Sequence, residues 1–325
     1  MLKRLSGATM LAGTLIVAAM GGALAQGWPN KPVTVIVPFA AGGNVDAAAR
    51  IFSERLSARL GKTFIIENRT GAGGSIGINA MAKAPADGYT IGVASAGSLF
   101  ILPHIFKEKL GYDTFRDLKP LALVATQPNF IVVHPSLPVK TPKEFIDHLK
   151  ANPGKYSYGS SGIGTSQHLC MEILAQKTGI QVTHVPYRAS NQIMQDLIGG
   201  TIQMSCDQIS TALAQVQGGK AKGIAVSSLK PYSLAPEYPA MAEAVPGVDV
   251  TWSAVFVAPA GIPKDIAEKL TQTLLEITRE PDIKKRLESM TVTPESLGGA
   301  ALEKQLRADY DTWKPIIESA KIPAP

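Results

Sequence analysis

Short β-branched runs alternate with amphipathic helical segments along this chain, and the alternation limits the fold more than any other feature. The first run covers residues 33–37, and a glycine-rich turn separates it from apolar residues at helical spacing over 45–60. Further strands are expected at 64–67 and 90–94, with a helix over 75–84 between them. Strands that alternate with helices usually pair in parallel, so the sequence predicts an α/β fold with a parallel sheet.

The alternation resumes after a long extended stretch at residues 121–134, and a second such stretch follows at 252–258. Between them, strands are expected at 156–158, 182–185, 202–206 and 223–226, with helices over 141–151, 166–178 and 191–198. The last helices are expected at 264–278 and 301–319. We therefore predict one α/β domain from residues 26–126 with 251–325 and another from 127–250. Two connections between them allow hinge motion.

The N-terminus has the three parts of a secretory signal peptide. Lys3 and Arg4 give a basic start, residues 11–20 form a short apolar run, and Ala23-Leu24-Ala25 supplies the small residues that a signal peptidase reads. The apolar run is shorter than the roughly 20 residues that cross a bilayer. We expect cleavage after Ala25 and a mature chain in the periplasm.

Length and charge narrow the classes of partner. The chain has 325 residues, which agrees with two domains at about 150 residues each. Its formal net charge is +6, which becomes +4 once Lys3 and Arg4 are removed. Because lysines and arginines do not cluster among aromatic residues, we expect no nucleic-acid partner. The mild positive charge favours small anions.

The two cysteines, Cys170 and Cys206, are interpreted first as small core residues, one in a predicted helix and one at the end of an apolar strand. An exported chain can also join them in a disulfide, and the sequence leaves this open. Neither the cysteines nor the histidines and acidic residues have metal-ligand spacing. We therefore expect no metal and no cofactor.

Two glycine-rich loops each join a predicted strand to a predicted helix, Phe39-Ala40-Ala41-Gly42-Gly43-Asn44 and Ser160-Ser161-Gly162-Ile163-Gly164-Thr165. Ligands of open α/β folds usually bind at this edge of the sheet. Each following helix starts with unpaired N–H groups and a partial positive charge, which can hold a carboxylate or phosphate without a lysine or arginine. Either loop alone could be an ordinary turn. The pair, in two facing domains, favours an anion-binding site.

Four side chains near these loops each have two interpretations. Asp46 lies in a first helical turn, where it can stabilise the helix start or contact a ligand, and the sequence favours the first. Asp207 follows a predicted strand and can cap the next helix or bind ligand, with neither favoured. Tyr187 can face the cleft or pack inside. Arg188 is the one cation close to the predicted cleft, although a surface role is favoured.

A short G-x-S-x-G match centred on Ser75 is typical of a hydrolase nucleophile. Such a nucleophile needs a strand directly before the serine, and turn-forming residues 68–72 intervene here. Ser75 is therefore interpreted as a helix N-cap, and no catalytic residue is predicted. A periplasmic serine hydrolase acting through Ser75 remains an alternative.

Several ordered motifs resemble the Bug (TctC-type) receptors, which are extracytoplasmic solute-binding proteins of tripartite tricarboxylate transporters. The similar stretches are PFAAGG at 38–43, GAGG at 71–74, DGYT at 87–90, YGSSG at 158–162, HVPY at 184–187, Trp252, and APAG at 258–261. They follow one another in order over essentially the whole mature chain.

The resemblance implies a type II-like periplasmic-binding-protein architecture with two domains, a hinge of two crossing segments and a ligand cleft between the domains. It also implies a small carboxylate ligand, either a di- or tricarboxylate, an acidic amino acid or an aromatic acid, held by backbone amides and bridging waters. The expected binding residues are Phe39, Ala40, Ala41, Gly42, Gly43, Asn44, Asp46, Ser161, Gly162, Gly164, Thr165, Tyr187 and Asp207.

One departure from the family pattern leaves the ligand open. Related sequences often have Pro-Thr-Asp where this chain has Asn44-Val45-Asp46, so the threonine hydroxyl is lost. We expect a monomeric receptor without enzymatic activity that delivers its ligand to membrane transporter subunits. A ligand sensor that presents its closed form to a signalling partner is a further alternative.

Overall fold

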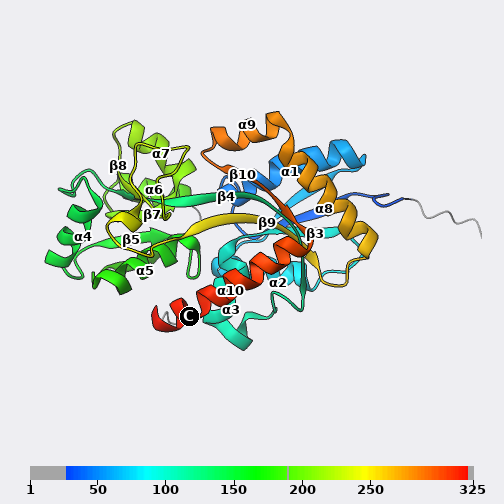
Figure 1. Ribbon diagram of the computed structural model, residues 1–325, viewed down its shortest axis with the longest axis horizontal. Coiled ribbons are helices and arrows are strands. Elements are labelled where there is room, and N and C mark those ends of the chain that lie inside the picture. Colours follow the sequence, from blue (N-terminus) through cyan, green and yellow to red (C-terminus); the bar gives the residue numbers. More distant parts are fainter. Residues whose placement is uncertain (1–26, 189, 321–325) are drawn as a thin grey trace, which may run out of the picture.

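The computed structural model describes residues 27–188 and 190–320 and shows two α/β lobes joined by two long strands (Figure 1). The first lobe is formed by the N-terminal strands and the C-terminal helices, and the second lobe by the middle of the chain. The predicted α/β class is confirmed. The predicted signal peptide lies outside the described residues, and the domain boundaries near 126 and 250 remain a prediction.

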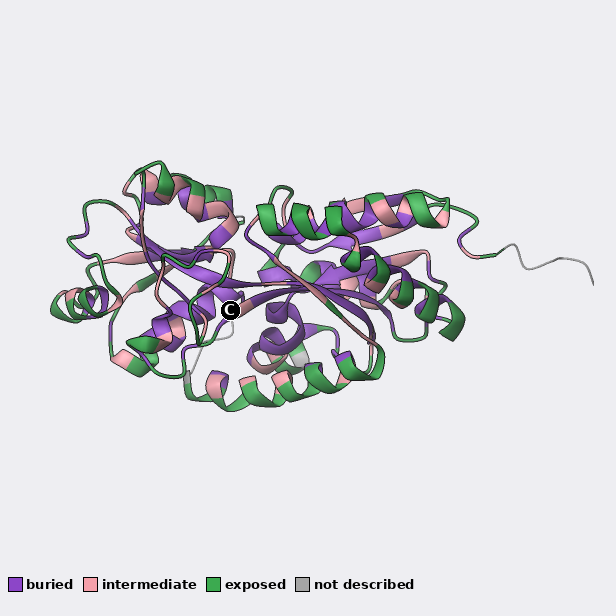
Figure 2. Ribbon diagram, turned by 45° about the horizontal axis from the view of Figure 1, so that its top comes forward, coloured by how far each residue is buried: buried purple, intermediate pink, exposed green. Residues whose placement is uncertain are grey.

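Strand β1 (Val33–Val37) lies in the middle of the sheet of the first lobe, and nearly all its side chains are buried. It pairs in parallel with β2 (Phe64–Asn68) and with β3 (Thr90–Ala94). An almost continuous apolar run suits a strand that is covered on both faces, and Figure 2 shows helices that turn their exposed sides away from the sheet. These helices are α1 (Asn44–Leu60), α2 (Ser75–Ala82), α3 (Leu102–Phe106), α8 (Lys264–Arg279), α9 (Pro281–Ser289) and α10 (Gly299–Ala320).

The second lobe repeats the arrangement around β5 (Ser157–Ser160). This strand pairs in parallel with β6 (Thr183–Pro186) and β7 (Met204–Gln208). Its helices are α4 (Pro142–Ala151), α5 (Ser166–Thr178), α6 (Ser190–Ile198) and α7 (Ile209–Gln217). The sequence-based bounds of α5 match those of the structure, and Gly179 in left-handed backbone ends this helix.

Two antiparallel strands, β4 (Leu118–Val133) and β9 (Thr251–Pro259), connect the lobes. They pair with each other until Pro128 lies opposite Thr251, and β4 then continues into the second lobe beside β7 and β8 (Lys222–Val226). The sheet is therefore mixed rather than wholly parallel as predicted. The reason is that the chain enters the second lobe in one direction and returns in the other.

Several elements of the first lobe were not predicted. They are the short 3-10 helices η2 (Ala72–Gly74) and η4 (Lys107–Leu110), the π-helix η3 (Gly97–Ile101), the helices α3 and α9, and strand β10 (Thr293–Gly298), which pairs with β4. Helix α10 extends to the second lobe, where Gln176 Nε2 donates to Ser319 Oγ over 2.6 Å. None of the helices in the described residues has both the length and the apolar character that crossing a bilayer requires.

Cys170 and Cys206 form a disulfide, with their Cα atoms 6.2 Å apart. Both are fully buried, as expected of core residues, and the bond that the sequence left open joins α5 to β7. It therefore fixes the helix that follows the second glycine-rich loop to strand β7, which lies between β4 and β5.

Candidate functional site

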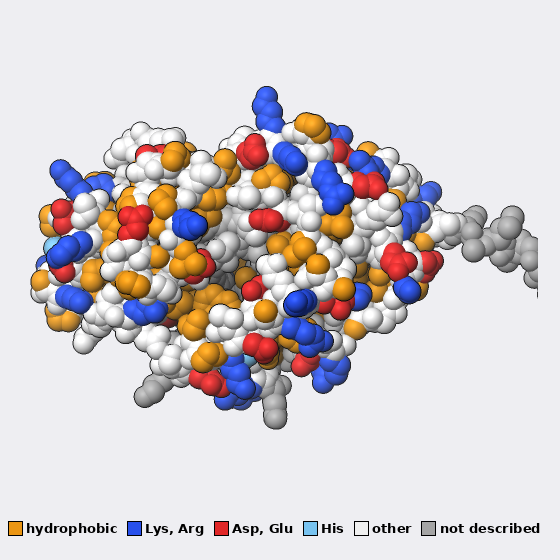
Figure 3. Space-filling view, viewed as in Figure 1, with side chains coloured by type: hydrophobic (Ala, Val, Ile, Leu, Met, Phe, Trp, Pro, Cys, Tyr) orange, Lys and Arg blue, Asp and Glu red, His pale blue; other side chains and the backbone are white. Residues whose placement is uncertain are grey.

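Two adjoining cavities lie between the lobes, where the surface is hollowed (Figure 3). The inner pocket has the first turns of α1 and α5 in its walls. The outer cavity lies against residues 70–74 of the first lobe and residues 186–188 of the second. Phe39, Ser161 and Arg188 border both cavities, so the two form one cleft.

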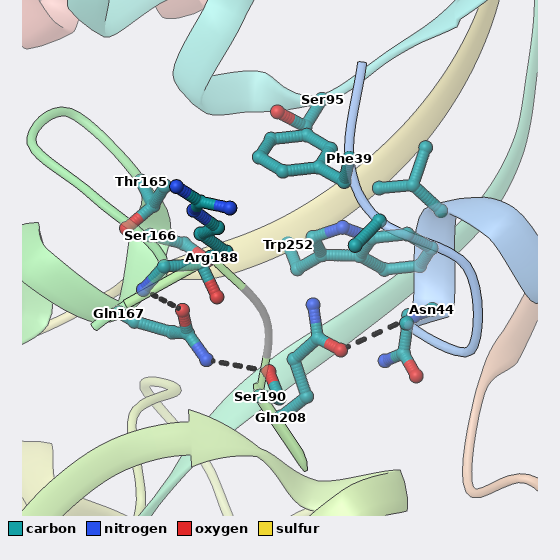
Figure 4. A pocket seen from close by; sticks show the side chains of 14 residues that line it. Phe39, Asn44, Ser95, Thr165, Ser166, Gln167, Arg188, Ser190, Gln208 and Trp252 are labelled. Atoms are coloured by element: carbon teal, nitrogen blue, oxygen red, sulfur yellow. Dashed lines mark hydrogen bonds between the residues drawn. The ribbon is translucent and has the colours of Figure 1, made fainter. Parts of the chain in front are cut away.

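Most of the polar side chains that line the inner pocket are uncharged (Figure 4). Its side-chain hydroxyl groups include those of Ser95, Thr165, Ser166 and Ser190, and its amide groups include those of Gln167 and Gln208. Phe39 and Trp252 supply an apolar side. Among the described residues that line the two cavities, Arg188 has the only charged side chain.

The start of α1 presents free backbone donors to the inner pocket. Gly43 is the N-cap and has no side chain that could cap the first-turn N–H groups, and of these groups the Asn44 N–H donates to the Gln208 side chain. Asp46, in this turn, points elsewhere and is buried, where it accepts hydrogen bonds from the Gly42 N–H (3.0 Å), Arg50 Nε (2.8 Å) and Asn68 Nδ2 (2.9 Å). Burial opposes ionisation, but these donors outweigh it and lower the pKa of Asp46. Asp46 thus stabilises the first glycine-rich loop through hydrogen bonds on the side that faces away from the pocket.

The start of α5 faces the same pocket. Thr165 is its N-cap and accepts from the His168 N–H, and the loop before it contains Gly162 and Gly164 in left-handed backbone. Two histidines, the buried His168 and the half-buried His184, hold this loop in place. His184 Nε2 lies 2.6 Å from Ser160 Oγ, and His168 Nδ1 accepts from the Gly164 N–H over 3.4 Å.

The burial of these histidines disfavours the imidazolium form. It lowers the pKa of His184 to about 4 and that of His168 to about 3. Both rings are therefore neutral near pH 7, which leaves each with a nitrogen that can accept a hydrogen bond. The loop that lines the cleft is thus supported by uncharged groups.

Asn44 connects the first lobe to the second directly across the inner pocket. Its backbone N–H donates to Gln208 Oε1 over 3.2 Å, and its Oδ1 accepts from the Ser210 hydroxyl. Its Nδ2 donates to Gln127 Oε1 of the crossing strand β4 over 2.5 Å. These bonds are formed where Asn44 replaces the proline that is common in the resembling family, and a proline could make none of them.

Backbone atoms of the two lobes also approach closely around the cleft. A Cβ atom on Gly97 would lie 2.5 Å from the Gly164 carbonyl oxygen, and one on Gly73 would lie 2.3 Å from that of Ile163. Real Cβ atoms are not found at such distances. The glycines therefore allow the lobes to meet in the arrangement observed.

Asp207 lies behind the inner pocket and not in its wall. The carboxyl group is fully buried, and its Oδ1 accepts from the Gln208 N–H (2.7 Å) and the Gln167 amide. Burial raises the pKa of Asp207 to about 6, although these hydrogen bonds oppose the shift. Because Gln167 lines the pocket, Asp207 acts by orienting its side-chain amide, and it also fixes the backbone N–H of Gln208.

Tyr187 and Arg188 come from the loop after β6. Tyr187 borders the outer cavity, and its hydroxyl donates to Asp196 Oδ2 over 2.7 Å. Burial and the adjacent Asp196 carboxylate raise the pKa of Tyr187 to about 12. Arg188 is exposed, as a surface role implies, yet its side chain points into the cleft in Figure 4.

The structure brings together most of the residues predicted for the site. The inner pocket contains Phe39, Ala40, Gly43, Asn44, Ser161 and Thr165, and the outer cavity adds Gly162 and Tyr187. Outside both linings lie Ala41, Gly42, Asp46, Gly164 and Asp207. The contact of each of these residues with a ligand remains a prediction.

Sequence reasoning missed several lining residues. They are Val45, Ser95, Ser166, Gln167, Ser190, Gln208 and Trp252. Ser166 and Gln167 could have been found, because the first turn of α5 follows the predicted loop directly. Gln208 and Trp252 gave no such signal, since their positions depend on how the two lobes and the crossing strands are paired.

Ser75 lies in a different setting from a hydrolase nucleophile. It is the first residue of α2, its N-cap is Gly74, and the η2 turn separates it from the end of β2 at Asn68. In the part of the chain that the structure describes, no histidine makes a hydrogen bond to the Ser75 hydroxyl. The same part of the chain contains no group of three or more His, Cys, Asp or Glu residues that could hold a metal ion.

Comparisons with known proteins agree with this architecture. The model of the tripartite tricarboxylate transporter family receptor (TctC) matches residues 48–322. A Pseudomonas sp. strain P51 relative, described as a UPF0065 protein in the tcbD-tcbE intergenic region, is 33% identical over 323 residues, which cover 97% of this chain and 95% of the relative.

Two solved structures are also similar. R. palustris Rpa4515 with adipate is 30% identical, with a TM-score of 0.87 over 91% of this chain and 99% of that chain. MatC from Rhodopseudomonas palustris with bound malate is 27% identical, with a TM-score of 0.84 over 89% of this chain and 100% of that chain.

Two α/β lobes on a pair of crossing strands, with a cleft between them, define the architecture of a periplasmic solute-binding protein. The chain belongs to the TctC receptor family of tripartite tricarboxylate transporters. The resemblance to Bug-type receptors is thereby confirmed.

Proposed function

We propose that this protein is exported to the periplasm and captures a small carboxylate between its two lobes. One observation carries the proposal, namely that the start of α1, whose N-cap is a glycine, and the start of α5 face the same pocket. Each helix start contributes a partial positive charge and N–H donors, which suit a carboxylate. The neutral hydroxyl and amide side chains around them provide further hydrogen bonds.

The relatives support the same class of ligand. Rpa4515 was solved with adipate and MatC with malate, and both compounds are small carboxylic acids. Contacts from both lobes favour the closed arrangement when ligand is bound, because a ligand shifts an equilibrium only through its different affinities for the two states. The closed form is then the one recognised by membrane subunits of a tripartite tricarboxylate transporter.

The ligand class is tested by isothermal titration of the mature chain with aliphatic mono- and dicarboxylates, acidic amino acids and aromatic acids. We expect one-to-one binding of at least one acid and no binding of the corresponding uncharged amides or alcohols. Native mass spectrometry of the purified protein adds an independent search for a retained ligand. Absence of binding across all the acids would contradict the proposal.

The role of the helix start is tested by Ser166→Pro, compared with Ser166→Ala. Ser166 is the first residue of α5, where proline fits the helix but lacks the N–H. Thr165 is already extended (φ −75°, ψ 158°), as the residue before a proline should be. We expect Ser166→Pro to bind the tightest acid about 10-fold more weakly than Ser166→Ala, which corresponds to one hydrogen bond to a charged group. Equal affinities would show that this N–H does not contact the ligand.

A further inference from the structure

We propose that Arg188 is a specificity-determining residue that binds a second carboxylate of the ligand, so that the receptor selects dicarboxylates over monocarboxylates and amino acids. This inference rests on the proposed function, because it assumes that a first carboxylate is held at the start of α1, near Asn44. It gives Arg188 a separate role, because binding of the first carboxylate does not require this side chain.

The position of Arg188 carries the argument. It lies on the loop after β6 and borders the inner pocket and the outer cavity, as do Phe39 and Ser161. In Figure 4 its guanidinium group lies beside Thr165, whereas Asn44 and Gln208 lie toward the other side of the pocket, with Trp252 above them. A ligand held near Asn44 therefore extends toward Arg188 across the apolar side of the pocket.

The charges around the cleft support a second anionic group. Within residues 27–188 and 190–320, no Asp or Glu side chain lines either cavity, and no ion pair of Arg188 is present. The guanidinium group thus keeps its five donors available, and its fork matches a carboxylate. The ammonium group of an amino acid finds no carboxylate partner on the described walls.

Apolar side chains are also available to the methylene part of such a ligand. The rings of Phe39 and Trp252 lie along the inner pocket, between its two polar ends in Figure 4. A short methylene chain packs on these rings while its two carboxylates reach donors at either end. A monocarboxylate of the same length leaves Arg188 without its partner.

The test combines one protein change with one ligand change. Wild type and Arg188→Gln are titrated with succinate, glutarate and adipate, and with the monoamide of each acid, which keeps the size but removes one charge. For the best diacid we expect Arg188→Gln to weaken binding about 10- to 100-fold, as for a charge-assisted pair of about 1.5–3 kcal/mol. Binding of its monoamide should change less than threefold.

Two further variants act as controls. Arg286→Gln removes an exposed arginine that pairs with Glu54 far from the cleft, and it should leave both affinities unchanged. Arg188→Lys keeps the positive charge but loses the paired N–H donors of the guanidinium group. Its affinity for the diacid should lie between those of wild type and Arg188→Gln. Unchanged thermal midpoints will show that all variants are folded.

The other outcomes overturn the inference. If Arg188→Gln weakens diacid and monoamide equally, Arg188 contacts the first carboxylate, and only the proposed function stands. The proposed function also stands alone, without this inference, if wild type binds the monoamides as tightly as the diacids. It stands alone as well if wild type binds aromatic or monocarboxylic acids but no diacid. If wild type binds no acid of any class, the proposed function fails as well.

Discussion

At the scale of single residues, the site depends on buried polar side chains that do not line the pocket. Asp207 and Asp46 are both buried acids, yet their environments shift their pKa values in opposite directions. Asp46 has a cationic donor in Arg50, whereas Asp207 has only neutral donors. Asp207 therefore carries an unfavourable charge near pH 7, while it orients the side-chain amide of Gln167 and accepts from the Gln208 backbone N–H.

Asp207→Asn should stabilise the protein at neutral pH. The carboxyl group has a pKa of about 6 in the folded protein and 3.8 when unfolded, so the folded state takes up more protons between these values. The contribution of Asp207 to the free energy of unfolding therefore falls as the pH rises between these two pKa values. Above about pH 6 the full destabilisation by its carboxylate is present. A shift of about two units gives roughly 1–3 kcal/mol at pH 8. Asparagine keeps an acceptor for Gln167 and Gln208.

Urea denaturation of wild type and Asp207→Asn at pH 4, 6 and 8 measures this effect. The stability difference should be largest at pH 8 and close to zero at pH 4. A variant that is less stable than wild type at pH 8 would mean that the carboxylate charge itself stabilises the fold.

At the scale of elements, two helix starts and the glycines opposite them determine how closely the two lobes approach each other at the cleft. Gly97 belongs to η3 of the first lobe, and its backbone is not in the left-handed region, so alanine fits there locally. The obstacle is the Gly164 carbonyl of the second lobe, 2.5 Å from the added Cβ atom. The steric conflict is therefore specific to the contact between lobes.

Gly97→Ala should weaken ligand binding about 10-fold or more without unfolding either lobe, because it holds the helix starts apart and bound ligand then lacks contacts from one side. Titration with the tightest acid, together with the radius of gyration in solution, measures both effects. Gly218→Ala is a suitable control, since it adds the same methyl group at the end of α7, away from the cleft lining. Unchanged affinity in Gly97→Ala would show that the lobes bind ligand without this approach.

Elements with a strong apolar pattern could be predicted closely from the sequence, and weakly patterned ones could not. The buried strand β1 and the capped helix α5 have the expected bounds. The turns around α3 and the polar strand β10, which contains Pro294, have no clear periodicity, because packing against β4 and α10 stabilises them. The loops of the site were found from their glycines, whereas Gln208 and Trp252 required knowledge of strand pairing.

At the scale of the whole molecule, the disulfide and the crossing strands determine stability and motion. Cys170 and Cys206 close a loop over a sequence separation of 36 residues, entirely within the second lobe. Such a bond restricts the unfolded chain and leaves movement between lobes unaffected. An exported protein would form it in an oxidising compartment.

Replacing both cysteines by alanine should lower the free energy of unfolding of the second lobe by about 2–4 kcal/mol. Urea denaturation with and without a thiol reductant measures the loss, and wild type under reducing conditions should resemble the double variant. The double variant itself should not respond to the reductant. Equal stability of oxidised wild type and the double variant would show that the bond does not contribute.

The joint between the lobes is a hydrogen-bonded ribbon of β4 and β9, not a pair of loose linkers. A ribbon bends easily across its flat face but resists sliding of one strand along the other, since sliding would break its ladder of bonds. Under the proposed function, this ribbon confines opening and closing to a narrow arc and brings the two lobes back to the same alignment after each release of ligand.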